Sequence, residues 1–128
     1  TLSDLAAYQP KTRSAFCTDY TAVTQTAYVI CGMPPPSSGA IAVAQILGMT
    51  PAMTRRNSVD KGVPTAAWLH RYTEASRLTF ADRGLYVADP DFVEAPGGDW
   101  KSLVNPEYLA RRALAIGDQS MKRAKPGD

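Results

Sequence analysis

Apolar and polar residues follow different spacings in successive parts of the chain, and each spacing predicts a different element. Residues 14–33 are rich in Val, Thr, Tyr, Phe and Cys and partly alternate, which predicts two strands joined by a turn near 21–25. The turn contains no Asn-Gly pair, so the pattern does not fix the register of this hairpin. Residues 39–47 are apolar almost all round, which predicts a buried helix that Gly48 ends.

Two further helices are predicted in the second half of the chain. The first begins at Thr65 and ends near Gly84, because apolar residues recur there at helical spacing. Its apolar stripe, at spacings of three and four, consists of Leu69, Tyr72, Ser76 and Phe80, with Ala66 and Ala75 beside it. The second helix begins at Asn105 as its N-cap, has Pro106 in its first turn and ends at Gly117.

The ends of the chain and its connections carry polar and turn-forming residues. Residues 4–8 predict a short helix that Ser3 caps. Residues 49–64 contain prolines, a glycine and charged residues without helical periodicity, so we expect a long exposed connection there. Residues 88–100 predict turns, and we expect the polar tail at 118–128 to fray.

Size and composition describe one helix-rich α+β unit. A chain of 128 residues has the length of one ordinary domain and no internal repeat divides it, so we treat residues 1–128 as a single unit. The net charge of +2 and the absence of a charged tail give no reason to expect nucleic acid as a partner. No apolar run approaches the roughly 20 residues that cross a bilayer, so we expect no membrane contact from this segment.

A turn-rich corner separates the predicted hairpin from the first buried helix. It consists of Pro34, Pro35, Pro36, Ser37, Ser38 and Gly39. A serine between a strand and a helix is one feature of a nucleophile elbow, but the glycine pattern differs and the single histidine, His70, lies in a later helix. We therefore interpret Ser37 or Ser38 as a helix cap. The corner also lacks the lysine of a phosphate loop, and His70 has no partner at metal-ligand spacing.

Asp82, Asp89 and Asp91 form the carboxylate cluster of the sequence. Paired carboxylates serve in acid-base chemistry or bind calcium, but no loop glycine or downstream glutamate stands at calcium-loop spacing. Asp89 and Asp91 flank Pro90, so we interpret the aspartates as turn-forming and helix-capping residues. Arg83 is the expected ion-pair partner of Asp82. These residues predict neither a metal site nor a cofactor site.

Cys17 and Cys31 lie on the two arms of the predicted hairpin. Cross-strand neighbours come close enough for a disulfide if the register pairs them. In an oxidising compartment such a bridge would staple the hairpin, whereas in the cytosol the two residues would be buried thiols. No Lys, Arg or His flanks either cysteine, so neither has the surroundings of an activated thiolate.

Four segments carry a specific and ordered pattern. They are DLAAY (4–8), VICGMPPPSSGAIAVAQILGM (29–49), EASRLTFADRGLYVADPDFV (74–93) and NPEYLARRA (105–113). Together they resemble the gamma-glutamyltransferase (gamma-glutamyltranspeptidase) family. The resemblance implies an N-terminal nucleophile hydrolase with a four-layer αββα sandwich, made by a precursor that cuts itself into a large and a small subunit. The freed N-terminal threonine of the small subunit would attack the gamma-glutamyl amide of glutathione and pass the glutamyl group to water, an amino acid or a peptide.

The matching segments resemble the C-terminal part of the large subunit. The family's nucleophile, in a threonine-threonine-histidine motif, and its substrate-binding arginine have no counterpart here, so the resemblance assigns no catalytic residue to this chain. It implies a scaffold that is inactive alone and whose partners are the rest of the large subunit and the small subunit. A separated fragment would expose apolar surface and self-associate. Ala40 stands where the family usually has a second glycine, which reduces backbone freedom at the helix start.

Two other functions stay open. A related acylase of the same fold, such as a cephalosporin or glutaryl acylase, differs from a gamma-glutamyltransferase in residues that this chain lacks. A non-catalytic interaction module with the same pattern is the second alternative. The resemblance also implies a periplasmic or extracellular location, with which a Cys17–Cys31 bridge is compatible.

Overall fold

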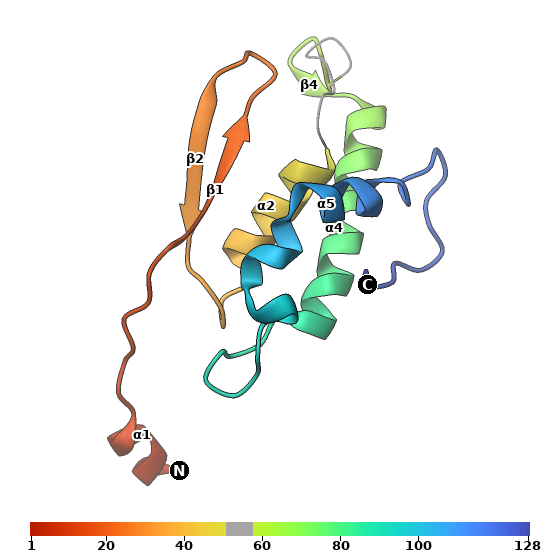
Figure 1. Ribbon diagram of the computed structural model, residues 1–128. Helices are drawn as coiled ribbons and strands as arrows, with labels where there is room; N and C mark the ends of the chain where they lie inside the picture. The colour runs from red at the N-terminus through yellow and green to blue at the C-terminus, as the bar shows by residue number, and fades with distance from the viewer. Residues whose placement is uncertain (51–57) are drawn as a thin grey trace.

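The computed structural model describes residues 1–50 and 58–128 and combines helices with small antiparallel sheets (Figure 1). Its elements in chain order are α1 (Leu2–Ala7), β1 (Phe16–Thr21), β2 (Ala27–Gly32), α2 (Gly39–Met49), β3 (Val59–Asp60), β4 (Val63–Pro64), α4 (Ala66–Tyr86), the 3-10 helices η1 (Pro96–Gly98) and η2 (Trp100–Val104), and α5 (Pro106–Ala113). The predicted α+β class is confirmed. The turns expected at 88–100 are also present, with the two 3-10 helices among them.

The predicted hairpin is confirmed, and its register places Cys17 opposite Cys31. Its turn is closed by two backbone hydrogen bonds, from the Ala22 N–H to the Thr26 carbonyl and from the Gln25 N–H to the Ala22 carbonyl. Gln25 has a φ of 64°, in the left-handed region. The hairpin stands beside α2, and both of its strands contact that helix (Figure 1). Within the described residues β1 and β2 pair only with each other, so each strand has one unpaired edge.

Helix α2 supplies the centre of the core. It contacts the hairpin, α4, η2 and α5, and its own buried residues are Ile41, Ala44, Gln45 and Met49. The apolar core is made of Phe16, Ile41, Met49, Ala75, Leu78, Leu103, Tyr108, Leu109 and Ile116. The prediction that Gly48 ends the helix is wrong, because the helix continues to Met49. Gly48 instead serves packing, since its missing Cβ leaves room for Leu109 of α5.

We expect Gly48→Ala to lower stability by about 1–3 kcal/mol, the usual effect of overpacking a core. A Cβ at residue 48 would lie 2.3 Å from Cδ1 of Leu109. Gly84→Ala is the matched control, because a Cβ at that position of α4 meets nothing within 4 Å, and a helical alanine should add roughly 0.5–1 kcal/mol. Denaturant unfolding of both variants checks the pair, and equal effects would contradict this assignment of Gly48.

Helix α4 begins as predicted but buries the opposite side from its apolar stripe. Thr65 is the N-cap, with Oγ1 accepting the Trp68 N–H at 3.2 Å. The helix ends at Tyr86, two residues beyond the predicted Gly84. Its buried residues are Glu74, Ala75, Leu78, Thr79 and Asp82, whereas Leu69, Tyr72 and Phe80 are 48%, 43% and 59% exposed. The prediction fails because helical spacing does not show which side other elements cover. The inner face joins the apolar core through Ala75 and Leu78 and binds polar partners through Glu74 and Asp82.

The short helix α1 is confirmed with a different cap. Thr1 accepts the Asp4 N–H through Oγ1 at 3.3 Å, and Asp4 in return accepts from the N-terminal amine. The prediction of Ser3 as the cap is therefore wrong, since Ser3 lies inside the helix. No residue of α1 is buried, and Leu2 and Leu5 are exposed.

Helix α5 has the predicted cap and a shorter length. Asn105 accepts the N–H groups of Glu107 and Tyr108 through Oδ1, at 2.9 and 3.3 Å. The helix ends at Ala113 and not at Gly117, because the next residues form tighter turns that bond three residues back. No helix within the described ranges is long and apolar enough to span a membrane.

Two connecting or terminal segments have more structure than their sequences indicate. The expected connection at 49–64 is exposed at residues 59–64, as predicted, and contains the short pair of β3 and β4 around Lys61 and Gly62, both with positive φ; residues 51–57 lie outside the described residues. The expectation that the tail at 118–128 frays is wrong. The tail returns beside α4 (Figure 1), because buried carboxylates of that helix bind its backbone.

Candidate functional site

The proline-serine corner leads into α2 without presenting a nucleophile. Ser37 donates its N–H to the Pro34 carbonyl at 3.0 Å, and Pro35 is buried. Ser38 occupies the N-cap position but makes no side-chain cap, and its Oγ instead accepts from Nε of Arg83 at 2.8 Å. The prediction of Ser38 as the N-cap residue is therefore confirmed by its position, although its side chain accepts no N–H of the helix. The ring of His70 contacts the carbonyl of Gly117 and is bonded to neither serine.

His70 is used in a structural contact. Its Nε2 lies 2.8 Å from the carbonyl oxygen of Gly117, which joins α4 to the segment after α5. Groups of three or more residues suited to bind a metal are absent from the part of the chain that the structure describes.

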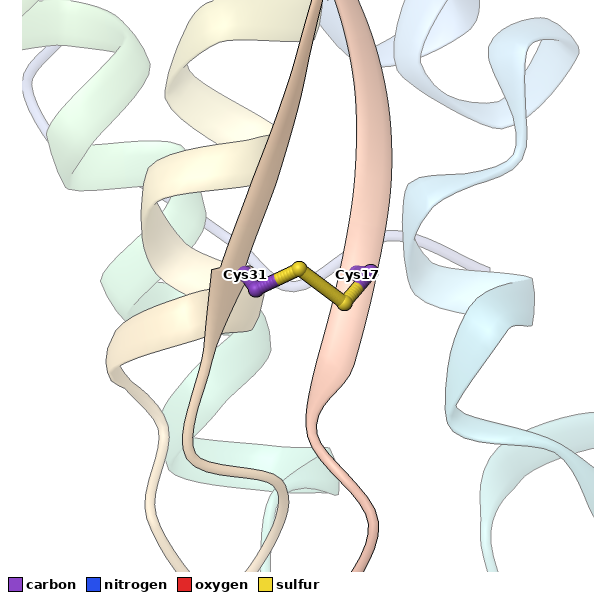
Figure 2. Close-up of a disulfide and its surroundings, with 2 residues drawn as sticks. All are labelled: Cys17 and Cys31. Carbon is purple, nitrogen blue, oxygen red and sulfur yellow. A yellow bond between two sulfur atoms is a disulfide. The ribbon is translucent and has the colours of Figure 1, made fainter.

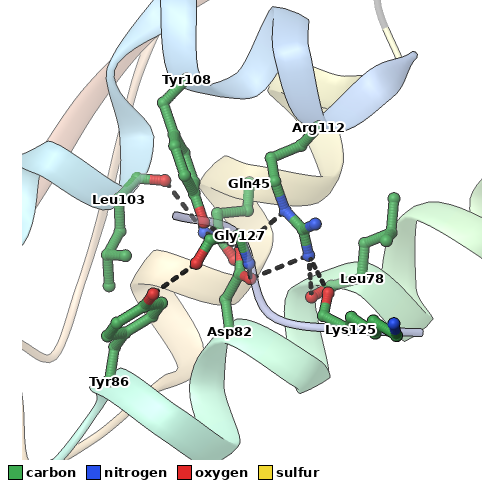
Figure 3. Close-up of polar contacts among 9 residues, drawn as sticks. All are labelled: Gln45, Leu78, Asp82, Tyr86, Leu103, Tyr108, Arg112, Lys125 and Gly127. Atoms are coloured by element: carbon green, nitrogen blue, oxygen red, sulfur yellow. Dashed lines mark hydrogen bonds and ion pairs between the residues drawn. The ribbon is translucent and has the colours of Figure 1, made fainter. Parts of the chain in front are cut away.

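Asp82 lies at the centre of a buried polar group that we name the Asp82 cluster, consisting of Gln45, Asp82, Tyr108, Arg112 and Gly127 (Figure 3). Asp82 is 0% exposed. Its Oδ2 accepts from Gln45 Nε2 at 3.1 Å and from Tyr108 Oη at 2.8 Å. Its Oδ1 accepts from Arg112 Nη2 and from the Gly127 N–H, each at 2.8 Å. Four elements far apart in sequence therefore meet at one carboxylate.

The Asp82 cluster is a structural centre rather than a reactive one. Arg112 balances the buried charge and also donates to the carbonyls of Leu78 and Lys125, at 3.1 and 2.8 Å. Burial, and then the hydrogen bond to Asp82, raise the pKa of the Tyr108 hydroxyl well above its usual value, so Tyr108 stays protonated and donates. Both oxygens of Asp82 are occupied by donors, which leaves no lone pair directed at a substrate.

The predicted ion pair between Asp82 and Arg83 is wrong. The partner of Asp82 is Arg112, thirty residues away on α5. Consecutive helix residues point about 100° apart, so Asp82 faces inward while Arg83 reaches Ser38 and the ring of Phe80 on the outside. Sequence reasoning missed Tyr108 and Arg112, although their spacing of four residues places them on one face of α5.

Glu74 is a second buried carboxylate that the sequence analysis missed. Its Oε1 accepts from Arg77 at 2.8 Å and from Ser120 at 3.2 Å, and its Oε2 accepts the Met121 N–H at 2.8 Å. Burial raises the pKa of the Glu74 carboxyl group, but the hydrogen bonds from Met121, Arg77 and Ser120 outweigh it and hold the pKa below its usual value. Glu74 is therefore ionised and bound to the C-terminal segment at neutral pH.

Acid should weaken the contact between Glu74 and the C-terminal segment. A carboxyl group whose pKa is lower in the folded than in the unfolded protein stabilises the folded state at pH values above the unfolded pKa, here near 4.5. This stabilisation is lost as the pH falls through the pKa of the folded protein. We expect the Met121 amide to exchange faster, relative to its intrinsic rate, as the pH falls from about 6 to about 3. In Glu74→Gln this pH dependence should be smaller. An unchanged pH dependence in the variant would contradict the role of Glu74.

Asp89 and Asp91 belong to a separate surface group. Asp91 Oδ2 lies 2.6 Å from Lys11 Nζ and 3.0 Å from Arg13 Nη2, and Asp89 lies 3.4 Å from the same arginine nitrogen. Hydrogen bonds from Lys11 and Arg13 lower the pKa of Asp91. Asp89 also accepts the Asp91 N–H across Pro90 at 3.0 Å, which is the expected turn. These two aspartates share none of the bonds of Asp82, so the three do not form one site.

Cys17 and Cys31 are joined by a disulfide across the hairpin (Figure 2). Their Cα atoms lie 4.1 Å apart, the close spacing of a pair that does not exchange backbone hydrogen bonds. The bridge joins β1 to β2 and involves no helix, so it acts on the hairpin alone.

Comparison of the sequence with protein families gives a match over residues 1–128 to the family described as gamma-glutamyltranspeptidase. The chain is 36% identical to a glutathione hydrolase proenzyme of Escherichia coli strain K12, over 98% of this chain and 19% of that protein. It is 32% identical to the acylase ACY 1 proenzyme of Pseudomonas sp. strain SE83, over 96% of this chain and 20% of that protein. The chain therefore spans about a fifth of the length of these relatives.

Solved structures give the same result. Gamma-glutamyltranspeptidase of Helicobacter pylori matches with a TM-score of 0.79 and 33% identity, over 99% of this chain and 34% of that one. Gamma-glutamyltranspeptidase of Pseudomonas nitroreducens, complexed with L-DON, matches with a TM-score of 0.77 and 29% identity, over 98% of this chain and 36% of that one. The arrangement of α2, α4, α5 and the hairpin is thus similar to a part of each of these larger chains.

Proposed function

The chain belongs to the gamma-glutamyltranspeptidase family, and from this premise we propose that it is a scaffold segment of an enzyme that transfers or hydrolyses gamma-glutamyl groups. The observation that carries the proposal is the match over the whole chain, in sequence and in fold, to one part of longer proenzymes. In such an enzyme an N-terminal threonine outside this segment would attack the gamma-glutamyl amide and release the amine. The resulting acyl-enzyme would then react with water, an amino acid or a peptide.

The site geometry supports a structural role for these residues. The carboxylates of Glu74 and Asp82 are buried and bound to donors of the same chain. Ser38 Oγ accepts from the Arg83 guanidinium, which only donates, and within the described residues neither Ser37 nor Ser38 is hydrogen-bonded through its side chain to a histidine or a carboxylate. We therefore assign the chemistry to other parts of the enzyme and the positioning of helices to this segment.

The exposed apolar surface supports a role inside a larger protein. It covers three elements: α1, with Leu2 and Leu5; β2, with Tyr28 and Val29; and α4, with Leu69, Tyr72 and Phe80. Surfaces of this kind in folded proteins usually mark contacts with other protein parts. The unpaired edges of the hairpin add a second surface of the same kind. We propose that the rest of the large subunit and the small subunit cover these surfaces.

The test uses the full-length protein that contains these residues. Intact mass should show self-cleavage into two subunits, and the protein should release the chromophore from a gamma-glutamyl anilide, faster when a dipeptide acceptor is added. Ser37→Ala should retain this activity, because Ser37 is not the nucleophile. Absence of both cleavage and anilide hydrolysis would overturn the proposal and favour a non-catalytic module.

An acylase is the second candidate, because the acylase proenzyme matches nearly as much of the chain. A glutaryl amide substrate separates the two candidates, since it lacks the α-amino group that a gamma-glutamyl substrate carries. Preferential turnover of the glutaryl amide would assign the protein to the acylases.

A further inference from the structure

Two carboxylate-arginine pairs hold the C-terminal segment in the same way. In the first pair, Glu74 accepts the Met121 N–H at 2.8 Å, and Arg77 donates to the Lys122 carbonyl at 3.4 Å. In the second pair, Asp82 accepts the Gly127 N–H and Arg112 donates to the Lys125 carbonyl, each at 2.8 Å. Each pair thus binds one N–H and one carbonyl of the backbone of the C-terminal segment.

The distance between the two pairs suits the length of the C-terminal segment. Glu74 and Asp82 are eight residues apart on the buried side of α4, which is about 12 Å along the helix axis. The six steps from Met121 to Gly127 can span up to about 20 Å, so the segment reaches both anchors without being taut. Arg77 and Arg112 lie beside their carboxylates and fix the direction of the backbone, since each binds only a carbonyl of it.

The second anchor selects glycine. A Cβ at residue 127 would lie 2.4 Å from Tyr108 Oη and 2.7 Å from Arg112 Cδ. The Gly127 carbonyl also accepts from the hydroxyl of Tyr86. Between the anchors the side chains of Lys122, Arg123, Lys125 and Pro126 are exposed. The groove therefore recognises a backbone path and one glycine, and it makes no selection among the side chains at these four exposed positions.

We propose that the buried faces of α4 and α5 form a peptide-binding groove for a segment that has glycine at its second anchor, and that residues 120–127 occupy it as a detachable strap. The strap makes few apolar contacts, mainly through the partly buried Met121 and Ala124. Segments with few buried apolar contacts open at lower free energy than a packed core does. The strap therefore leaves the groove while the helices stay folded. This inference does not depend on the proposed enzymatic function, because all of its contacts lie within the described residues.

Gly127→Ala tests the strap in the full-length protein. Trypsin cleavage after Lys122 and Arg123 should accelerate at least about tenfold, which corresponds to a loss of 1.4 kcal/mol of docking free energy. Gly117→Ala is the matched control, because it lies before the strap and a Cβ there meets nothing within 4 Å. Peptide-level hydrogen exchange of α4 should stay at the wild-type rate in both variants. A simultaneous rise of exchange in α4 would overturn the proposal, since the segment would then be part of the core.

The first anchor is tested separately. Glu74→Gln should speed exchange around Met121 more than around Gly127, whereas Glu94→Gln removes an exposed charge outside the groove and should change neither.

A peptide supplied in trans tests the groove itself. A fluorescent peptide with the sequence of residues 118–128 should bind the full-length Gly127→Ala protein better than the wild type, whose groove is occupied. The same peptide carrying Gly127→Ala should bind neither. A wild-type cleavage rate in Gly127→Ala, unchanged exchange around Met121 in Glu74→Gln, or equal binding of the two peptides would overturn the proposal.

Discussion

Replacing Asp82 by Ala is expected to lower the stability of the protein by about 3–5 kcal/mol, the usual effect of removing one partner of a buried ion pair. The Arg112 guanidinium, whose side chain is 10% exposed, would be left without its carboxylate. Gln45, Tyr108 and Gly127 would each lose an acceptor at the same time. The midpoint of urea unfolding of the full-length protein measures the effect.

A double variant distinguishes the charge from the other bonds. Asp82→Leu combined with Arg112→Met removes both charges and should be less destabilised than the sum of the two single changes, because no unpaired buried charge is left. Asp99→Ala is the control, since that aspartate caps a 3-10 helix at the surface, and should lower stability by only about 0.5–2 kcal/mol. Equal effects of Asp82→Ala and Asp99→Ala would show that the cluster contributes little.

Loss of the disulfide is the second large effect. The double change Cys17→Ala and Cys31→Ala removes a bridge between residues that are 14 positions apart. A disulfide that closes a loop of about 15 residues contributes about 3 kcal/mol to the free energy of unfolding. The hairpin should respond most, because a sheet of two strands is only marginally stable by itself. Hydrogen exchange of the peptides that cover β1 and β2 should accelerate, while α4 should change much less.

Reductant provides the control for the disulfide. The wild-type hairpin should exchange faster in reductant, and the double cysteine variant should not respond. If reductant affects both proteins equally, or neither, the bridge does not hold the hairpin.

The sequence predicted the parts of the fold that depend on residues close to one another along the chain. The hairpin, the start of α4 at Thr65 and the cap of α5 at Asn105 all depend on residues within a few positions of one another. The buried character of α2 followed in the same way, because it is apolar on nearly every side.

The sequence could not predict which contacts form between distant segments. Asp82 lies 30 residues from Arg112 and 45 from Gly127, and no local pattern links them. For the same reason the outward apolar stripe of α4 was assigned to the wrong side, since helical spacing identifies a stripe but not what covers it. Polar residues such as Glu74 and Asp82 identify a buried helix face only once the residues that bind them are known.

The way in which α4 and α5 bind the backbone of the strap also predicts how this region changes in evolution. Substitutions at Lys122, Arg123 and Lys125 should accumulate freely among descendants of this gene, because selection acts there on the path of the main chain alone. The codon for Gly127 should stay fixed, since every other amino acid adds a side-chain carbon where Tyr108 and Arg112 already lie. We therefore expect homologous sequences to vary at positions 122, 123 and 125 and to keep glycine at position 127.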